Sequence, residues 1–272
     1  MTACKSDERL RRLHDLRPLA LKAQGMTGAD IERIVRQARQ QARRKKRQLT
    51  WKDIEKGIVG NRRPFLPEER WRMAVHEAGY ALILHILQVG HPLTLSIEEQ
   101  VGLGFATERR KLVLLEKDCE DNLAVMLAGR AAEELVLGAV SVGSGMRPGS
   151  DLANATDLAL AMETTYGFSR KRPLLFCDGL ARRELLHENH PVTNRVNERL
   201  QKAYDTACHG LIRYAAAHRM LAEGLLEHGV LEGETVTAIL NDAVQRQDQQ
   251  GSRSSVSIAD SRSQKTRSPG PA

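Results

Sequence analysis

The segment Val75-His-Glu-Ala-Gly-Tyr-Ala81 constrains this chain more than any other, because it sets metal-binding side chains in a helical pattern. The apolar periodicity around it predicts a helix from about Glu68 to Leu87. On a helix, residues i and i+4 share a face, so His76 and residue 80 project together. In the pattern H-E-x-x-H, two histidines at this spacing bind Zn²⁺ and the glutamate activates a bound water. Residue 80 is tyrosine, so the pattern is incomplete.

Two interpretations of this segment follow from the residues alone. His-Glu pairs are common on amphipathic helices, and a five-residue pattern with one mismatch often arises by chance. The alternative is a zinc site in which Tyr80 takes the place of an imidazole. A phenol has a pKa near 10, against about 6.5 for imidazole, so zinc would have to lower that pKa to obtain a phenolate ligand. The motif by itself leaves both interpretations open.

Composition and cysteine placement restrict the fold class. Of the 272 residues, 41% are hydrophobic and 4% aromatic, and long Ala/Leu/Arg/Glu-rich runs predict a mainly α protein with a small β element. The four cysteines include no C-x-x-C pair, which argues against a disulfide framework and fits a reducing cytosol. No apolar run approaches the roughly 20 residues that span a bilayer. We therefore expect a cytoplasmic chain with no membrane span of its own.

Capping patterns and composition divide the chain into three parts. A small helical module is expected at residues 10–63, where Thr27-Gly-Ala-Asp30 and Thr50-Trp-Lys-Asp53 form capping boxes that open helices. Residues 64–245 are expected to form the main domain. Residues 246–272 are rich in Gln, Ser, Arg and Pro and have almost nothing to bury, which predicts a disordered tail.

Within the main domain the pattern alternates between helical and extended. Leu93, Leu95 and Ile97 alternate with polar residues and precede a Gly-punctuated stretch, which predicts a hairpin or small sheet. An exposed strand edge there could accept an extended peptide, so the candidate substrate-binding residues are Leu103, Gly104 and Phe105. Further helices are expected at Glu116–Leu137, Leu152–Tyr166, Pro191–Ala217 and His218–His228, with another from Gly233.

The net charge of +7 is unevenly distributed, with a dense basic run from Arg43 to Arg47. Such a run can bind phosphates or nucleic acid. The same run also suits a solvated helix end, because cations interact favourably with the carboxyl end of a helix dipole. We favour the second interpretation, so nucleic-acid binding is a minor alternative.

Several segments in a fixed order carry a family resemblance. They are Met73-Ala-Val-His-Glu-Ala-Gly79, Leu127-Ala-Gly-Arg-Ala-Ala-Glu-Glu-Leu135, Ser150-Asp-Leu-Ala-Asn-Ala-Thr156, Tyr166-Gly-Phe-Ser169 and Leu231-Glu-Gly-Glu-Thr-Val236. Together, from about Arg70 to Val244, they resemble the peptidase domain of the FtsH-type AAA+ zinc proteases. Upstream, Leu19 to Gly60 resembles the helical lid that ends the ATPase domain of that family.

The resemblance implies a role for each matching position. His76 and Asp151 would bind Zn²⁺, and Glu77 would be the general base that activates the metal-bound water. Asp151 could equally be a helix N-cap. Glu133 and Glu134 match a pair of acids, one of which would orient a metal ligand, although a solvated helix face explains them nearly as well. Tyr80 occupies the position of the second histidine ligand, and without it two ligands remain.

Partners and function follow from the same resemblance. The chain has no G-x-x-x-x-G-K-[ST] phosphate loop, so ATP would act only through a partner ATPase. The family forms hexamers that degrade unfolded polypeptides, which implies a homo-oligomer or an AAA+ partner, and membrane association through that partner. Three hypotheses remain open. They are a zinc endopeptidase with an altered metal site, an inactive pseudopeptidase acting as a structural or regulatory subunit, and a basic nucleic-acid-binding protein.

Overall fold

The computed structural model describes residues 19–20, 23, 26–60, 65–92, 94–97, 114–146, 148–177, 179, 184–186 and 190–246. Its helices are α2 (Gly28–Arg44), α3 (Trp51–Val59), α4 (Pro67–Ile86), α5 (Glu116–Leu137), the 3-10 helix η1 (Val142–Ser144), α6 (Asp151–Thr164), α8 (Pro191–Arg213), α9 (Ala215–His228) and a last helix at residues 233–246. Two short strands, β1 (Thr94–Ser96) and β2 (Val230–Glu232), complete the fold. The predicted mainly α class is confirmed.

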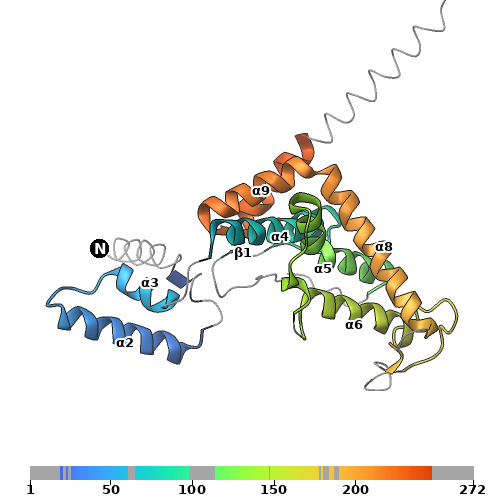
Figure 1. Cartoon of the computed structure of the whole chain (residues 1–272), viewed down its shortest axis with the longest axis horizontal. Coiled ribbons are helices and arrows are strands. Elements are labelled where there is room, and N and C mark those ends of the chain that lie inside the picture. The colour runs from blue at the N-terminus through green and yellow to red at the C-terminus, as the bar shows by residue number, and fades with distance from the viewer. Residues whose placement is uncertain are drawn as a thin grey trace, which may run out of the picture.

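Helices α2 and α3 pack against each other and lie to one side of the other helices (Figure 1). Both begin at the predicted capping boxes. The amide of Asp30 donates to Thr27 Oγ1 at 3.2 Å, and the amide of Thr50 donates to an Asp53 carboxylate oxygen at 2.9 Å. The small core between these helices includes Ile34 and is separate from the large core of the chain. The predicted tail at 246–272 lies almost entirely outside the described residues, so the division at 10–63, 64–245 and 246–272 stays a prediction.

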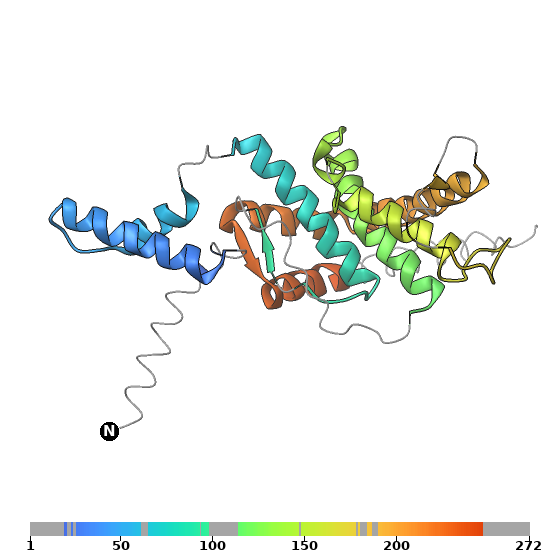
Figure 2. The same ribbon diagram turned by 90° about the horizontal axis from the view of Figure 1, so that it is seen from below.

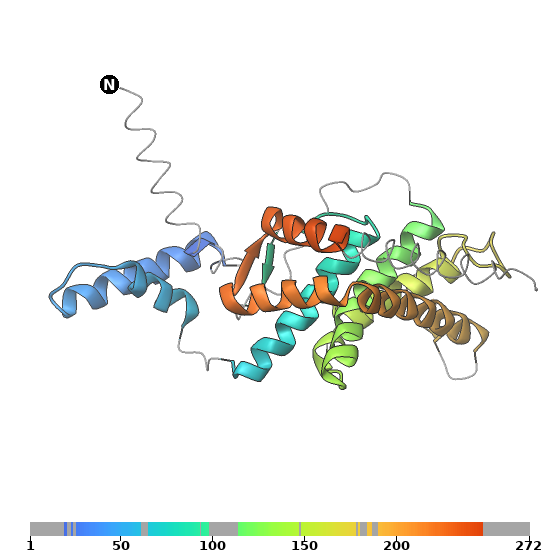
Figure 3. The same ribbon diagram turned by 90° about the horizontal axis from the view of Figure 1, so that it is seen from above.

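Helix α4 is the centre of the larger unit. It packs against α5 on one side and against α9 on the other (Figures 2 and 3). Most of its second half is buried, including the fully enclosed side chains of Leu82 and Ile83. A helix that is apolar on most of its surface is typical of the middle of a core rather than of its surface. The polar side chains of Glu77 and Tyr80, in this buried part of α4, therefore lie inside the core.

The predicted small β element is a two-stranded sheet. Strand β1 pairs antiparallel with β2, with Leu95 opposite Leu231. Of the two predicted alternatives, a hairpin or a small sheet, the described strands form a small sheet, whose second strand comes from the far end of the domain. The Leu103, Gly104 and Phe105 segment lies outside the described residues. The sheet ties the chain after α4 to the chain after α9.

Three smaller differences concern helix ends. The break between α8 and α9 falls at Tyr214 rather than after Ala217, and α6 ends at Thr164 rather than Tyr166. The predicted loop at 141–150 contains the short helix η1. Within the described ranges, no helix combines the length and the apolar character needed to cross a membrane.

Gly79 allows the close approach of α4 and α5 and gives a first testable prediction. A Cβ at this position would lie 2.7 Å from the Cβ of Ala132 and 2.9 Å from the carbonyl oxygen of Ala128, both on α5. Gly79→Ala should therefore lower the free energy of unfolding by about 1–3 kcal/mol through overpacking. The matched control is Gly224→Ala on α9, where the nearest atom lies at 3.8 Å. There, alanine should be neutral or stabilise by up to about 1 kcal/mol.

Urea unfolding followed by circular dichroism would measure both variants. Equal stability of the Gly79→Ala and Gly224→Ala proteins would contradict the tight α4–α5 contact.

Candidate functional site

Three helices bring five of the sequence-predicted site residues together. Helix α4 contributes His76, Glu77 and Tyr80, α5 contributes Glu133, and Asp151 opens α6. Glu77 and Tyr80 are buried and His76 is largely buried. The helical spacing therefore places the motif in the core, beside acidic residues that are distant in sequence.

Glu133 holds one side of the His76 ring. Its Oε1 lies 2.8 Å from His76 Nδ1, and its other oxygen accepts hydrogen bonds from Arg72 Nη1 and the Ser141 amide, both at 2.7 Å. Burial by itself would raise the pKa of Glu133, but the hydrogen bonds from His76 and Arg72 outweigh it and lower the pKa to about 2. Glu133 is therefore a fixed carboxylate at 2% exposure rather than part of a solvated helix face.

The other ring nitrogen of His76 faces Asp151. His76 Nε2 lies 3.5 Å from Asp151 Oδ2. Burial alone would lower the pKa of His76, but hydrogen bonding to Asp151 and Glu133 raises it to about 9. The ring also lies directly against α5, because a Cβ at Gly129 would be 2.4 Å from Nε2. In the absence of a metal ion, this pairing favours a charged imidazolium between two carboxylates.

Asp151 is not the N-cap of α6. That position belongs to Ser150, whose Oγ accepts from the amide of Ala153 at 3.4 Å. Asp151 is the first residue inside the helix, where a carboxylate interacts favourably with the helix dipole. Its side chain is thus free of the capping role that the sequence had left open, and it turns toward His76.

Tyr80 occupies the position of the second histidine, with its ring centre 5.4 Å from that of His76. Its hydroxyl donates a hydrogen bond to the carbonyl oxygen of Met126 at 2.9 Å. Burial raises the pKa of Tyr80 well above its usual value, and the negative charge of Asp151 raises it further. The phenol is therefore neutral, whereas metal binding would require the phenolate.

Glu77 has an unusual environment for a carboxylate. Its Oε2 is buried and makes no hydrogen bond with any described residue. Burial raises the pKa of Glu77 to about 8, although the neighbouring His76 opposes the shift. A buried polar atom without a partner is costly in a folded protein and often marks a functional position. Glu77 Oε2 thus has hydrogen-bonding capacity that no described residue uses.

These side chains meet only part of the requirement for zinc. Ligands of a tetrahedral zinc ion lie about 3.4 Å apart, which is close to the separation of His76 Nε2 and Asp151 Oδ2. A catalytic zinc ion usually has three protein ligands, however, and the third position here is Tyr80. Among the described residues, no three His, Cys, Asp or Glu side chains are grouped so that they could hold a metal ion. The donor set does not fit a three-ligand zinc site.

Some contributors were missed by sequence reasoning, and one predicted residue lies elsewhere. Arg72 is four residues before His76, so its helical spacing was a usable signal for a place on the same face. Ser141 and Met126 contribute backbone groups, which residue patterns do not reveal. Glu134 points away from the site and hydrogen-bonds to Tyr204 of α8.

The fold and site define a class: a helical peptidase-type domain with a His-Glu pair on its central helix. Comparison with known sequences agrees, since the profile of peptidase family M41 matches residues 64–239. The chain therefore belongs to peptidase family M41, the FtsH-type zinc metalloprotease family.

Several relatives carry the corresponding names. The chain is 34% identical to the ATP-dependent zinc metalloprotease FtsH 1 of Sorangium cellulosum, over 83% of this chain and 40% of the relative. It is 30% identical to the ATP-dependent zinc metalloprotease YME1L of Drosophila melanogaster, over 84% of this chain and 33% of the relative. It is 27% identical to FtsH of Lactiplantibacillus plantarum, over 83% and 33%. The chain thus matches about a third to two fifths of the length of these relatives.

Proposed function

We propose that this chain is a pseudopeptidase, an M41 domain that keeps the fold of the family and acts as a structural or regulatory subunit. The observation that carries the proposal is the hydrogen bond from the Tyr80 hydroxyl to the Met126 carbonyl. Tyr80, at the position of the second metal ligand, uses its hydroxyl to link α4 to α5. Its raised pKa opposes the phenolate form that zinc would need.

The remaining polar groups stabilise one another without a metal ion. His76 lies between the carboxylates of Glu133 and Asp151, so its positive charge is matched within the site. Breaking a buried pair of this kind is costly, whereas an intact pair is tolerated. Protonated Glu77 adds no further charge at neutral pH, consistent with the pKa of about 8. The charges of His76, Glu133 and Asp151 are therefore matched within the site, and the buried Oε2 of Glu77 is the group that this arrangement leaves without a partner among the described residues.

The partner we propose is an AAA+ ATPase of the FtsH type, or further copies of this chain in a ring. The relatives are named as ATP-dependent proteases, and α2 and α3 lie where the sequence predicts a lid-like module at 10–63. In such an assembly, ATP acts through the partner, unfolded polypeptides are the clients, and any membrane association also comes from the partner.

The second candidate is a zinc endopeptidase with a weakened metal site. Two observations favour it: the unpartnered Oε2 of Glu77 and the metal-compatible separation of His76 and Asp151. In this alternative, His76 and Asp151 hold Zn²⁺ and Glu77 is the general base. The ion would supply the Lewis acid for peptide hydrolysis.

Nucleic-acid binding has less support. Of the basic run at 43–47, Arg47 is paired with Asp53 at 2.6 Å, and Arg43 and Arg44 lie in the last turn of α2. Cations at that end of a helix are explained by the dipole. We therefore do not propose this function.

Zinc content of the purified full chain decides between the two candidates. The pseudopeptidase should carry far less than one zinc per chain by elemental analysis, with no difference between the parent and His76→Ala. About one zinc per chain, lost in His76→Ala, would refute the pseudopeptidase and establish the weakened metal site.

A further inference from the structure

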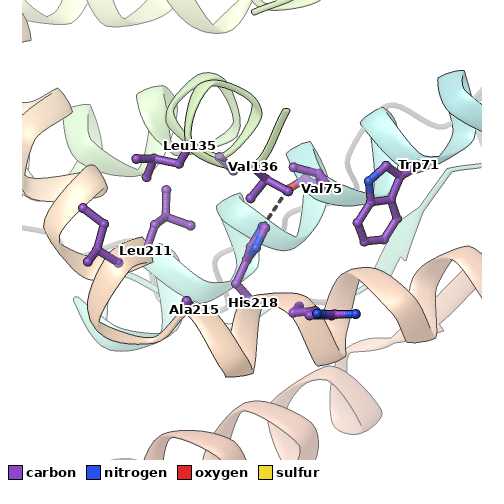
Figure 4. Close-up of a pocket in the computed structure, with 10 residues that line it drawn as sticks. Trp71, Val75, Leu135, Val136, Leu211, Ala215 and His218 are labelled. Atoms are coloured by element: carbon purple, nitrogen blue, oxygen red, sulfur yellow. Dashed lines mark hydrogen bonds between the residues drawn. The ribbon is translucent and has the colours of Figure 1, made fainter. Parts of the chain in front are cut away.

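A cavity of about 440 Å³ lies next to the site, where α4, α5, α8 and α9 meet. It is lined by Trp71, Val75, Ala132, Leu135, Val136, Leu211, Ile212, Ala215, His218 and Arg219 (Figure 4). Small-molecule sites have volumes of about 300–1,000 Å³ and are mostly apolar, with a few polar groups that orient the ligand. Neither proposed function uses this cavity.

His218 is the buried polar group of the cavity, and its protonation follows from one contact. Its Nε2 lies 2.9 Å from the carbonyl oxygen of Val75 (Figure 4). A carbonyl oxygen can only accept, so Nε2 must carry the hydrogen. Burial lowers the pKa of His218 and keeps the ring neutral. In a neutral imidazole with hydrogen on Nε2, the other nitrogen, Nδ1, is a hydrogen-bond acceptor.

This acceptor is unused. His218 is only 4% exposed, its ring lines the cavity, and Nδ1 makes no hydrogen bond with the described residues. Nδ1 is not one of the fully enclosed atoms without a partner, so it is accessible and can accept a hydrogen bond from a ligand. The cavity is therefore suited to a ligand that carries one hydrogen-bond donor.

The rest of the lining favours a neutral ligand. Arg219 donates from Nε to Glu223 Oε1 at 2.7 Å, so its charge is already matched. An anion would also face the lone pair of Nδ1 rather than a hydrogen. The side chains of Leu135, Val136 and Ile212 at the mouth are 44%, 48% and 62% exposed. Covering this apolar surface favours binding of an apolar body.

We propose that this cavity binds a small neutral molecule with an apolar body and one hydroxyl group, such as an alkylphenol. The hydroxyl donates to His218 Nδ1, and the apolar body packs between Trp71 and the aliphatic side chains at the mouth. The site is independent of metal binding at His76.

The fluorescence of Trp71, which lines the cavity, would report binding. The chain has two tryptophans, and the other, Trp51, lies on α3 and is 56% exposed. The full chain carrying Trp51→Phe would be titrated with 4-butylphenol, with excitation at the red edge of tryptophan absorption. We expect a saturable change in Trp71 emission. Absence of saturation would overturn the proposal.

The methyl ether of the same compound tests the role of His218. 4-Butylanisole lacks the donor but has an additional methyl group, which a purely apolar cavity would prefer by about fourfold. A hydrogen bond to Nδ1 is worth about two- to tenfold in favour of the phenol, so the roughly fourfold advantage of the ether should shrink or reverse. An ether that keeps its full advantage would overturn the proposed acceptor.

Two neighbouring alanines on α9 provide a matched pair of variants. Ala215 lines the cavity, whereas Ala216 does not, and both are exposed. In the Trp51→Phe background, Ala215→Phe should fill the cavity and abolish the phenol response, and Ala216→Phe should retain it. Equal binding by the two variants would place the ligand elsewhere and overturn the proposal.

Discussion

Tyr80→Phe should leave the chain without zinc, whereas Tyr80→His should give close to one zinc per chain. Residues 76 and 80 share a face of α4, and their rings are already 5.4 Å apart. Histidine at position 80 would add a third ligand to His76 and Asp151, as catalytic zinc sites require. Loss of a group that merely orients a ligand costs 10–100-fold in metal affinity, so gain of a ligand should be worth at least about 100-fold.

The cost of this change to the fold should be small. Tyr80→His removes the hydrogen bond from the Tyr80 hydroxyl to the Met126 carbonyl oxygen, which is worth about 1 kcal/mol. Tyr80→Phe loses the same bond without adding a metal ligand, so it separates stability from zinc binding. Elemental analysis and unfolding with and without chelator would measure both effects. If Tyr80→His also purifies without zinc, the metal site is lost through more than this one position.

Proteolysis extends the same test. Tyr80→His should cleave an unfolded substrate such as casein if the rest of the peptidase site is intact, and adding Glu77→Gln should stop cleavage but keep the zinc. The double variant is informative because Glu77 is not expected to be a ligand. Cleavage that survives Glu77→Gln would refute its assignment as the general base.

Local patterns predicted the helices better than the contacts between them. Helix α5 begins at Glu116 and ends at Leu137 as its periodicity indicates, because both ends depend on nearby residues. The pairing of Thr94 with Glu232 depends on how distant parts of the chain meet, and nothing in either strand encodes its partner. The sequence therefore predicted an extended segment here but did not identify its partner strand.

The site shows the same limit at the level of single residues. Ser150 and Asp151 are both good capping residues, so the pattern could not tell which one caps α6. Glu133 and Glu134 are adjacent and lie about 100° apart on α5, so only one can face His76. The packing of α5 between α4 and α8 decides that it is Glu133. The motifs predicted which residues belong to the site, and tertiary packing determines which of them contact one another.

An ion cluster that joins α6 and α8 should be a major source of stability. No sequence motif indicated this cluster. Glu163 accepts from Arg195 Nε at 2.6 Å and from Arg199 Nε at 2.7 Å, and its side chain is only 3% exposed. Glu163→Gln would remove the carboxylate that Arg195 and Arg199 share, although Arg199 keeps its pair with Glu116 at 2.9 Å. Breaking a buried pair costs about 3–5 kcal/mol. The control is Glu120→Gln, which removes an exposed pair with Lys202 and should cost at most about 1 kcal/mol.

Acid should remove the same stabilisation. Burial alone would raise the pKa of Glu163, but hydrogen bonds from Arg195 and Arg199 outweigh it and hold the pKa below the usual 4.5. A carboxyl group with a lower pKa in the folded state stabilises that state fully only above its unfolded pKa. Its contribution is lost as the pH falls below about 4.5 toward the folded value.

The difference in the free energy of unfolding between the parent and Glu163→Gln, measured in urea, should therefore be large near neutral pH. It should decrease as the pH falls below about 4.5. The small difference for Glu120→Gln should stay nearly constant. Since the cluster fixes α6, whose first residue is Asp151, its loss should also shift the environment of His76, visible in the ring resonances of that histidine. A Glu163→Gln difference that does not change with pH would mean that the carboxylate charge contributes little and that packing alone holds α6 to α8.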